Sequence, residues 1–235
     1  MRTSQPQESQ IMSAPTVSTE DTVVIHPPVL YFGTPVILLT TTNRDGTSNI
    51  TPMSSAWALA DRIVLGLASA GHGAANLLQR RDCVINVACA RLWKQVERIA
   101  RLTGRPDVPA HKARLGYTYA PDKFARGGFT PVRADTVRAA RIRECPLQIE
   151  ASLLAAHGDF HGICESPVTF EIQVQRVHAH RDIVIPDSHH IDVTRWQPLL
   201  YVFRHYVAAG ATLGTTFKAP SGSGASEWPP VSSAQ

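Results

Sequence analysis

The chain has 235 residues, of which 43% are hydrophobic and 18% are charged, which suits one soluble domain with a sizeable core. Its net charge of +4 is modest and its basic residues are scattered, so the sequence lacks the basic stripe that is typical of a nucleic-acid surface. It has no apolar run long enough to span a bilayer and no signal-peptide pattern, so we expect a cytoplasmic protein that binds neither nucleic acid nor membrane.

The two ends of the chain differ in composition from its centre. Residues 1–22 are rich in Gln, Ser and Thr, and residues 219–235 are rich in Pro, Gly and Ser. Such segments bury too little apolar surface to fold alone, so we expect disordered tails around one domain at 23–218.

The first half of this domain alternates between predicted strands and short helices. Residues 34–53, TPVILLTTTNRDGTSNITPM, predict two strands rich in β-branched residues that are joined by a turn at Asp45-Gly46. Four further elements follow, in order a strand, a short helix, a strand and an amphipathic helix, at residues 61–69, 73–80, 82–89 and 92–102.

The second half is dominated by strands. A loop-rich stretch at 103–136 precedes four predicted strands, at residues 146–157, 160–180, 182–185 and 198–207. Because neighbouring strands are joined mostly by short turns, the pattern favours a mainly β fold, an antiparallel barrel with a few peripheral helices, over repeated βαβ units.

A glycine turn lies where the strand at 61–69 meets the following helix. Gly71-His72-Gly73 begins like a dinucleotide fingerprint, but Asn76 occupies the position of the third glycine. The acidic residue expected about 20 positions further on is also absent, so the pattern is not a Rossmann motif. Two readings stay open: a tight turn alone, or an anion site at a helix N-terminus with Ser69 and His72 as further donors.

Histidines and cysteines raise the question of a metal site. His178 and His180 would share one side of a strand, and His189 and His190 follow in a loop with carboxylates nearby. The spacing matches no compact metal motif, so we expect no functional metal. The four cysteines form no CxxC pair and are expected to be reduced core residues: Cys83, Cys89, Cys145 and Cys164.

Four segments in the same order resemble the flavin reductase family, whose members share the FMN-binding split β-barrel. The first two are YFGTPVILLTTTNRDGTSNITPMSSAW, with its Gly-centred hairpin, and SAGHGAANLLQRRDCVINV, with its short helix and following strand. The last two are DKFARGGFTPVRADTVRAARIRECPLQIEA, with Asp-Lys-Phe and Glu-Cys-Pro, and WQPLLYVFRHYVAAGATLGTTF, with Pro-x-x-Tyr and Leu-Gly. The resemblance runs from Val29 to Phe217 and implies the split-barrel fold.

The resemblance also implies a flavin site in two parts. Residues beside the isoalloxazine and ribityl chain would be Met53, Ser54, Ser55, Ala56 and Trp57. Residues around the FMN phosphate would be Ser69, Ala70, Gly71, His72, Gly73 and Asn76. For Trp57, a core packing role is the alternative.

Gly71 and Gly73 depart from the pattern of the family. Relatives often carry Lys or Arg where Gly71 stands and Thr or Ser where Gly73 stands, so the phosphate would depend on backbone amides, His72 and an Arg from elsewhere. On this basis Lys at 71 and Thr at 73 are expected to tighten FMN binding.

Lys123 and Phe124 match a family segment that lies near the flavin face, with a solvated Lys beside a core Phe as the alternative.

The activity implied by the resemblance is that of an NAD(P)H-dependent flavin oxidoreductase. Hydride would pass from NADH or NADPH to FMN in a homodimer, and the reduced flavin would supply a partner monooxygenase. One alternative is an enzyme that keeps FMN tightly bound and reduces a small organic or metal-chelate substrate itself. Another is a flavin-binding module without turnover.

Overall fold

The computed structural model describes residues 22–160 and 166–216. Contacts divide the chain into two units, Met1–Leu30 and Tyr31–Gln235. In the first unit, the described residues 22–30 contain no helix or strand. All the elements described below belong to the second unit. Cys164 and the last two residues of the predicted domain lie outside the described residues.

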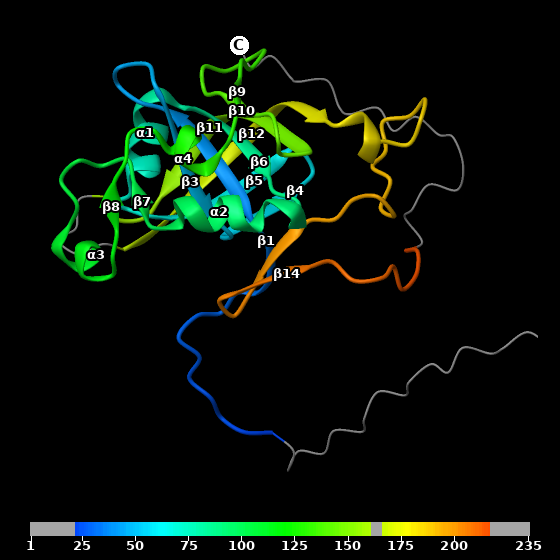
Figure 1. Ribbon diagram of the computed structural model, residues 1–235, viewed down its shortest axis with the longest axis horizontal. Helices are drawn as coiled ribbons and strands as arrows, with labels where there is room; N and C mark the ends of the chain where they lie inside the picture. Colours follow the sequence, from blue (N-terminus) through cyan, green and yellow to red (C-terminus); the bar gives the residue numbers. More distant parts are fainter. Residues whose placement is uncertain (1–21, 161–165, 217–235) are drawn as a thin grey trace, which may run out of the picture. The chain divides into compact units, whose positions relative to one another are not determined.

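A seven-stranded antiparallel sheet forms the body of the second unit (Figure 1). Its first hairpin turns at Asp45-Gly46 as predicted, where Gly46 has φ +85°. In spatial order its strands are β3 (Ser48–Met53), β2 (Ile37–Thr42), β6 (Asp82–Val87), β11 (Leu147–His157), β12 (Pro167–Ala179), β5 (Arg62–Ala68) and β4 (Ala56–Leu59).

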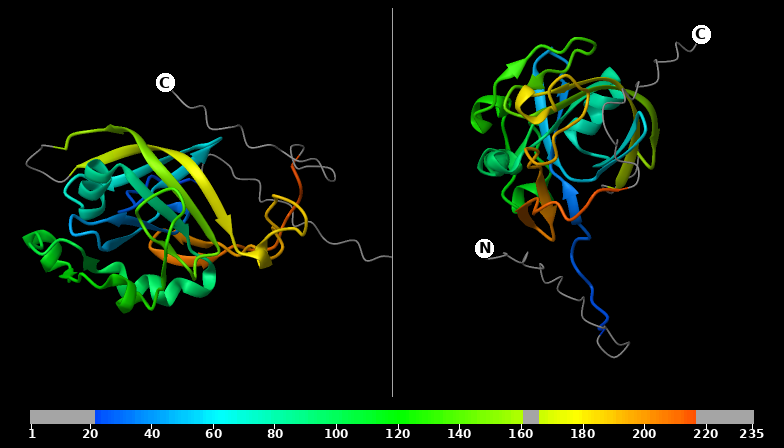
Figure 2. Two further views of the ribbon diagram at one scale, coloured as in Figure 1. Left: turned by 90° about the horizontal axis from the view of Figure 1, so that it is seen from above. Right: turned by 90° about the vertical axis from the view of Figure 1, so that its right-hand side faces the viewer.

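The sheet closes on itself because its two edge strands are neighbours in the chain. β3 and β4 lie at opposite ends of the strand order, yet only Ser54 and Ser55 separate them. The two edges must therefore approach each other, and Figure 2 shows the strands bending around a common interior. This arrangement is the split β-barrel predicted from the sequence.

Apolar side chains pack on both faces of the central strands. Along β2, Ile37 and Leu39 join the core inside the barrel, whereas Leu38 joins a second core on the other face. All six residues of β2 and of β6 are consequently buried, which explains their continuous apolar and β-branched sequences. β12 alternates between buried and less buried residues because one of its faces is more open.

Helices and short strands surround the barrel. Val96 and Ile99 of α2 pack into the second core, against Leu38 and Ile50 of the sheet. The helices are α1 (His72–Arg80), α2 (Trp93–Ala100), α3 (Ala110–Arg114) and α4 (Lys123–Gly127), with 3₁₀ turns at Ala90–Leu92 and Arg181–Ile183. The short strands are β1 (Phe32–Pro35), β7 (Leu102–Thr103), β8 (Thr118–Tyr119), β9 (Pro131–Val132), β10 (Arg141–Ile142), β13 (Leu199–Val202) and β14 (His205–Ala208). None of the helices in the described ranges is long and apolar enough to cross a membrane.

Two predicted strands were wrong in detail. The strand expected at residues 182–185 is a 3₁₀ turn followed by an isolated bridge between Val184 and Ile191. The strand expected at residues 198–207 is a hairpin of β13 and β14, which turns at Phe203 and Arg204 with φ of 41° and 72°. Both segments look like strands because they are apolar, and neither contains the Gly or Asn that typically marks such a turn.

Candidate functional site

A cavity of about 180 Å³ lies where the first turn of α1 meets β3 and the segment that follows α2. We call it the Lys123 cavity. Its lining residues are Thr51, Pro52, Leu67, Ala68, Gly71, His72, Gly73, Ala74, Ala100, Leu102, Thr103, Gly104, Lys112, Tyr117 and Lys123. Of the residues predicted for the site, it brings together Gly71, His72, Gly73 and Lys123.

The beginning of α1 supplies an anion-binding end to this cavity. β5 ends at Ala68, and the N–H of Gly71 donates to the Ala68 carbonyl at 2.9 Å, which makes the turn into the helix. No side chain caps the helix, and its first turn contains no acidic residue. The N–H groups and the positive end of the helix dipole therefore favour an anion at this end of the cavity.

Close contacts leave no room for a side chain at Gly71 or Gly73. A Cβ at position 73 would lie 2.5 Å from Oγ1 of Thr51, so the Thr51 hydroxyl occupies the space of a side chain there. A Cβ at position 71 would lie 2.9 Å from the carbonyl oxygen of Ala68. The structure thus argues against the expectation that Lys at 71 and Thr at 73 would improve the site. It also places a hydroxyl, that of Thr51, beside the position where relatives carry one.

Lys123 brings a buried positive charge to the cavity. Its side chain is only 4% exposed, and its Nζ donates a hydrogen bond to the Ile50 carbonyl at 2.8 Å. Burial lowers the pKa of the Lys123 ammonium to about 8. The alternative of a solvated lysine was therefore wrong. Its neighbour Phe124 is half-buried and packs against the second core.

His72 connects this cavity to the hairpin of β2 and β3. Its Nε2 lies 2.8 Å from Oδ1 of Asn43, which also accepts a hydrogen bond from the Asn76 amide at 2.8 Å. Because this oxygen only accepts, Nε2 of His72 is the donor and Nδ1 carries no proton in the neutral ring. Burial lowers the pKa of His72, and the charges of Lys123 and Arg105 lower it further. Asn76 also donates to Thr41, so its buried amide anchors α1 to the hairpin.

Arg105 lies beside the same turn but does not line the Lys123 cavity. It follows β7, and its Nη1 lies 3.4 Å from the carbonyl oxygen of Ala70 in the turn before α1. Lys112 and Lys123 line the cavity itself, and within the described part of the chain its lining includes no carboxylate. An uncapped helix end, two lysines and a hydroxyl form a donor set that fits a phosphate monoester.

The remaining predicted site residues lie outside the lining of this cavity. In the link between β3 and β4, the Ser55 hydroxyl lies 2.7 Å from the Tyr31 hydroxyl, and Ser54 is buried. Ser69 accepts a hydrogen bond from the N–H of Ser166 at 3.1 Å. Trp57 is 58% exposed on β4, so its alternative role as a core residue was wrong. Met53 and Ala56 pack against the core of the barrel.

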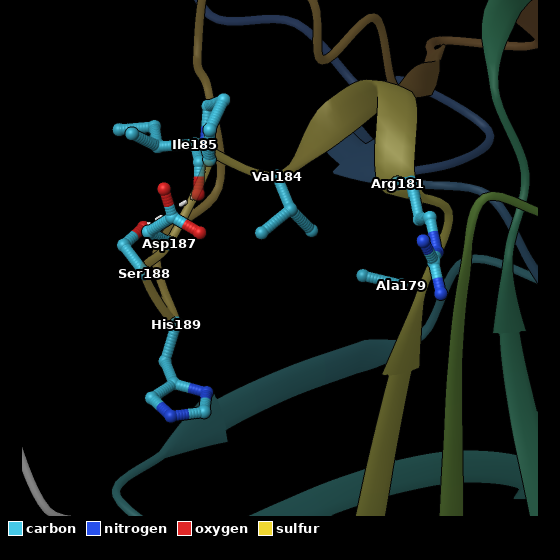
Figure 3. Close-up of a pocket in the computed structure, with 8 residues that line it drawn as sticks. Ala179, Arg181, Val184, Ile185, Asp187, Ser188 and His189 are labelled. Atoms are coloured by element: carbon cyan, nitrogen blue, oxygen red, sulfur yellow. Dashed lines mark hydrogen bonds between the residues drawn. The ribbon is translucent and has the colours of Figure 1, made fainter.

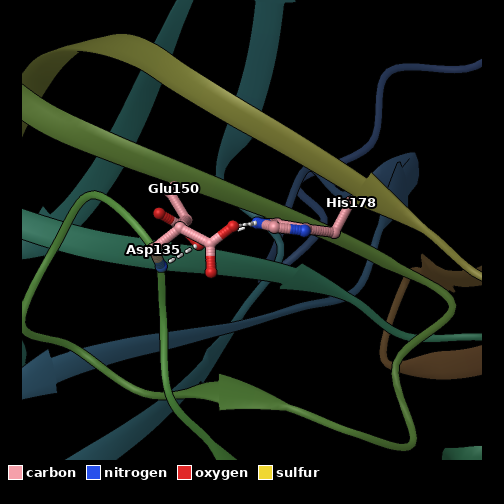
Figure 4. Close-up of side chains that lie close together, drawn as sticks. All are labelled: Asp135, Glu150 and His178. Carbon is pink, nitrogen blue, oxygen red and sulfur yellow. Dashed lines mark hydrogen bonds and ion pairs between the residues drawn. The ribbon is translucent and has the colours of Figure 1, made fainter.

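The histidines of the second half do not come together. His178 lies with Asp135 and Glu150, and the potential ligand atoms of the three are within 4.8 Å of one another (Figure 4). His180 bonds instead to the Arg143 carbonyl, and His189 lines a separate cavity of about 660 Å³ (Figure 3).

Glu150 is already well supplied with donors. It is fully buried and accepts hydrogen bonds from the N–H groups of Asp135 and Thr136, from the Thr136 hydroxyl and from His178 at 2.8 Å. Burial by itself would raise the pKa of this carboxyl, but these bonds outweigh it and lower the pKa to about 2. Glu150 therefore holds the loop around residues 135–136 against the sheet.

Comparisons with known proteins agree with this fold. Residues 29–210 match the model of the flavin reductase like domain. An uncharacterized protein of Bacillus subtilis (strain 168), YdfE, is 42% identical over 194 residues, which cover 83% of this chain and 92% of that protein.

Two solved structures share the fold. The flavoredoxin of Desulfovibrio vulgaris (Miyazaki F) is similar with a TM-score of 0.65 and 21% identity, over 90% of this chain and 99% of that one. Nitrilotriacetate monooxygenase component B of Bacillus cereus is similar with a TM-score of 0.63 and 14% identity, over 89% of this chain and 100% of that one. Because the family model covers most of the chain, the protein belongs to the flavin reductase-like family of flavoprotein oxidoreductases.

Proposed function

We propose that this oxidoreductase is an NAD(P)H-dependent flavin reductase that binds FMN with its phosphate in the Lys123 cavity. The observation that carries the proposal is the meeting of an uncapped helix N-terminus with Lys112 and Lys123 in one small cavity. A phosphate monoester is the part of FMN that such a donor set recognises.

Several groups of the cavity would contact the phosphate. Backbone N–H groups at the start of α1 donate to the phosphate, and Lys123 has donors left beyond its bond to Ile50. Thr51 offers its hydroxyl from the facing strand. The neutral ring of His72 gives its one proton to Asn43, so His72 would act by positioning the start of α1 rather than by donating to the phosphate.

The ring of FMN belongs, in this proposal, beside the link between β3 and β4. Ser54 and Ser55 carry backbone and side-chain donors there, and exposed Trp57 provides an aromatic neighbour. Bound flavin supplies the hydride chemistry, whereas the chain orients the two reactants and excludes water. No residue of the chain is required as an acid or base for that step.

The assembly and the partner are proposed on separate grounds. We propose a homodimer, which is supported by the exposed side chains of Trp57 and Leu59 on the edge strand β4. We also propose that reduced flavin is passed to a monooxygenase, because one structural relative is named as component B of such a system.

The test is a visible spectrum of the purified protein, followed by NADH and NADPH oxidation with and without added FMN, FAD or riboflavin. Oxidation that requires added flavin supports the proposal. A yellow protein that is reduced by the nucleotide but is indifferent to added flavin favours an enzyme with its own small-molecule substrate. A yellow protein that no nucleotide reduces favours a module without turnover, and a colourless protein without flavin affinity contradicts all three.

A further inference from the structure

The link between β3 and β4 is contacted by a tyrosine from outside the barrel. The hydroxyl of Tyr31 lies 2.7 Å from Oγ of Ser55, 24 positions further along the chain. Tyr31 directly precedes β1, and β1 belongs to a separate three-stranded sheet with β13 and β14 (Figure 1). This second sheet therefore reaches the point where the two edges of the barrel meet.

The hydrogen bond between the two hydroxyls has a preferred direction. A phenol is more acidic than an aliphatic alcohol and is the stronger donor, so the Tyr31 hydroxyl donates and Oγ of Ser55 accepts. Among the described residues, Tyr31 is the only hydrogen-bond partner of the Ser55 hydroxyl. The single proton of Ser55 is consequently left available for an acceptor that is not part of these residues.

The backbone at Ser55 is held from the other side by β5. The Ser55 carbonyl accepts a hydrogen bond from the N–H of Gly66 at 2.7 Å. A Cβ at position 66 would lie only 3.0 Å from the Cβ of Ser55, so β5 approaches the link closely because position 66 is a glycine. Since the backbone of Ser55 is fixed in this way, the direction of its hydroxyl depends on the bond to Tyr31.

Tyr31 is itself held in place by neighbouring aromatic side chains. Its ring packs edge-on against Tyr201 with ring centroids 5.3 Å apart, and its carbonyl accepts a hydrogen bond from the N–H of Phe203 at 2.7 Å. The ring of Tyr201 lies 5.7 Å from that of Tyr206, whose hydroxyl donates to Glu97 of α2 at 3.1 Å. The Tyr31 hydroxyl is therefore a donor whose position is set before any ligand binds.

We propose that Tyr31 is a positioning residue, which keeps the Ser55 hydroxyl available as a hydrogen-bond donor to the ring of bound flavin. The inference rests on the proposed function, which puts that ring beside the link between β3 and β4. A donor held beside acceptor atoms of the ring stabilises the negative charge that they gain on reduction. Tyr31 thus favours the reduced flavin over the oxidised flavin without touching either of them.

The experiment measures the reduction potential of FMN bound to the full-length chain, under anaerobic conditions and against a reference dye. The variants are Tyr31→Phe, Ser55→Ala and the two combined. Tyr31→Phe keeps the ring contact with Tyr201 but leaves the Ser55 hydroxyl free to rotate. The matched control is Tyr206→Phe, which removes a hydroxyl from the same aromatic group without a contact to Ser55.

The two single variants should change the potential in the same direction. We expect the preference of the protein for reduced over oxidised FMN to fall about tenfold in Ser55→Ala and by a similar factor in Tyr31→Phe, seen as a more negative potential. Adding Tyr31→Phe to Ser55→Ala should cause no further fall, because Tyr31 acts through the Ser55 hydroxyl. Tyr206→Phe should have the potential of the wild type.

Three results would overturn the inference while leaving FMN binding intact. The first is a wild-type potential in Tyr31→Phe. The second is an effect of Tyr31→Phe that persists undiminished in the Ser55→Ala background, and the third is an equal shift in Tyr206→Phe, which would assign the effect to the aromatic group as a whole. If the wild type does not bind FMN, the proposed function fails and this inference fails with it.

Discussion

Lys123 donates a hydrogen bond from its Nζ to the backbone carbonyl of Ile50 at 2.8 Å, and its side chain is almost fully buried. One carbonyl does not compensate an ammonium group for the loss of water, which is why burial lowers the pKa of Lys123 to about 8. The free chain therefore carries a poorly compensated charge at pH 7, which a bound anion would stabilise. This relationship is the main reason to propose an anion site in the Lys123 cavity.

The first prediction concerns stability without ligand. At pH 7 the Lys123 charge is present in both the folded and the unfolded chain, and the depressed pKa of about 8 costs the folded state about 3 kcal/mol. Lys123→Met should therefore raise the free energy of unfolding by about 2 kcal/mol once the lost hydrogen bond is subtracted. This difference in the free energy of unfolding should shrink as the pH rises above 8, because Lys123 of the folded wild type then loses its proton and no longer buries a charge. Urea unfolding at pH 7 and pH 9.5 measures this, and a destabilised variant at pH 7 would contradict it.

The second prediction concerns the pH dependence of FMN binding. Above pH 8 the free chain loses the Lys123 proton, so FMN affinity should fall about fivefold between pH 8 and pH 9. The other titratable side chains that line the cavity are Lys112, Tyr117 and His72, and the lowered pKa of His72 leaves its ring neutral over this range. Fluorescence titration at each pH gives the affinity. Lys123→Met is the control and should bind weakly without this pH dependence; a fall of the same size in the variant would assign the proton to another group.

The third prediction concerns the contact between Gly73 and Thr51. A side chain at position 73 must displace the Thr51 hydroxyl, which lies 2.5 Å from the Cβ position. Gly73→Thr should therefore weaken FMN binding and lower the free energy of unfolding by about 1–3 kcal/mol. Adding Thr51→Ala creates room and should restore most of both. If Gly73→Thr alone tightens FMN binding, the expectation from the sequence holds and the steric account is wrong.

The fourth prediction concerns the loop held by Glu150. Because the folded pKa of about 2 lies below the ordinary pKa of a glutamate, this carboxylate contributes stability near neutral pH that is lost as the pH falls through 2. Glu150→Gln should lower the free energy of unfolding by about 2 kcal/mol at pH 7, with a difference that shrinks toward pH 2. Glu171→Gln removes a more exposed ion pair with Arg62 and serves as the control, with a loss below about 1 kcal/mol. Equal losses in both variants would contradict the role of Glu150.

Most of the sheet could be predicted from the sequence because its buried strands have continuous or alternating apolar residues. β2 and β6 are buried on both faces and read as continuous apolar or β-branched runs, and the hairpin turn at Asp45-Gly46 requires the positive φ that glycine adopts. The turn at Phe203-Arg204 adopts similar angles with residues that rarely do so, so no local signal marked it.

The site could be predicted only in part, because its members come from separate segments. Gly71, His72 and Gly73 form one local motif and were found together. Thr51 reaches the motif from β3, and Arg105 reaches it from the loop after β7. Contacts between segments that lie so far apart in the sequence cannot be predicted from a local motif. Lys123 was found through its resemblance to relatives, but its burial, which gives it its chemistry, follows only from packing in three dimensions.

The most direct test of the proposed phosphate site is the Kd of FMN compared with that of riboflavin, which lacks the phosphate, for the wild-type chain and for Lys123→Met at pH 7. We predict that the wild type binds FMN at least a hundredfold more tightly than riboflavin, since several charge-assisted hydrogen bonds depend on the phosphate. In Lys123→Met this preference should fall about tenfold or more while riboflavin binding stays the same. Equal affinities of the wild type for FMN and riboflavin, or an unchanged preference in the variant, would contradict the assignment of the phosphate to the Lys123 cavity.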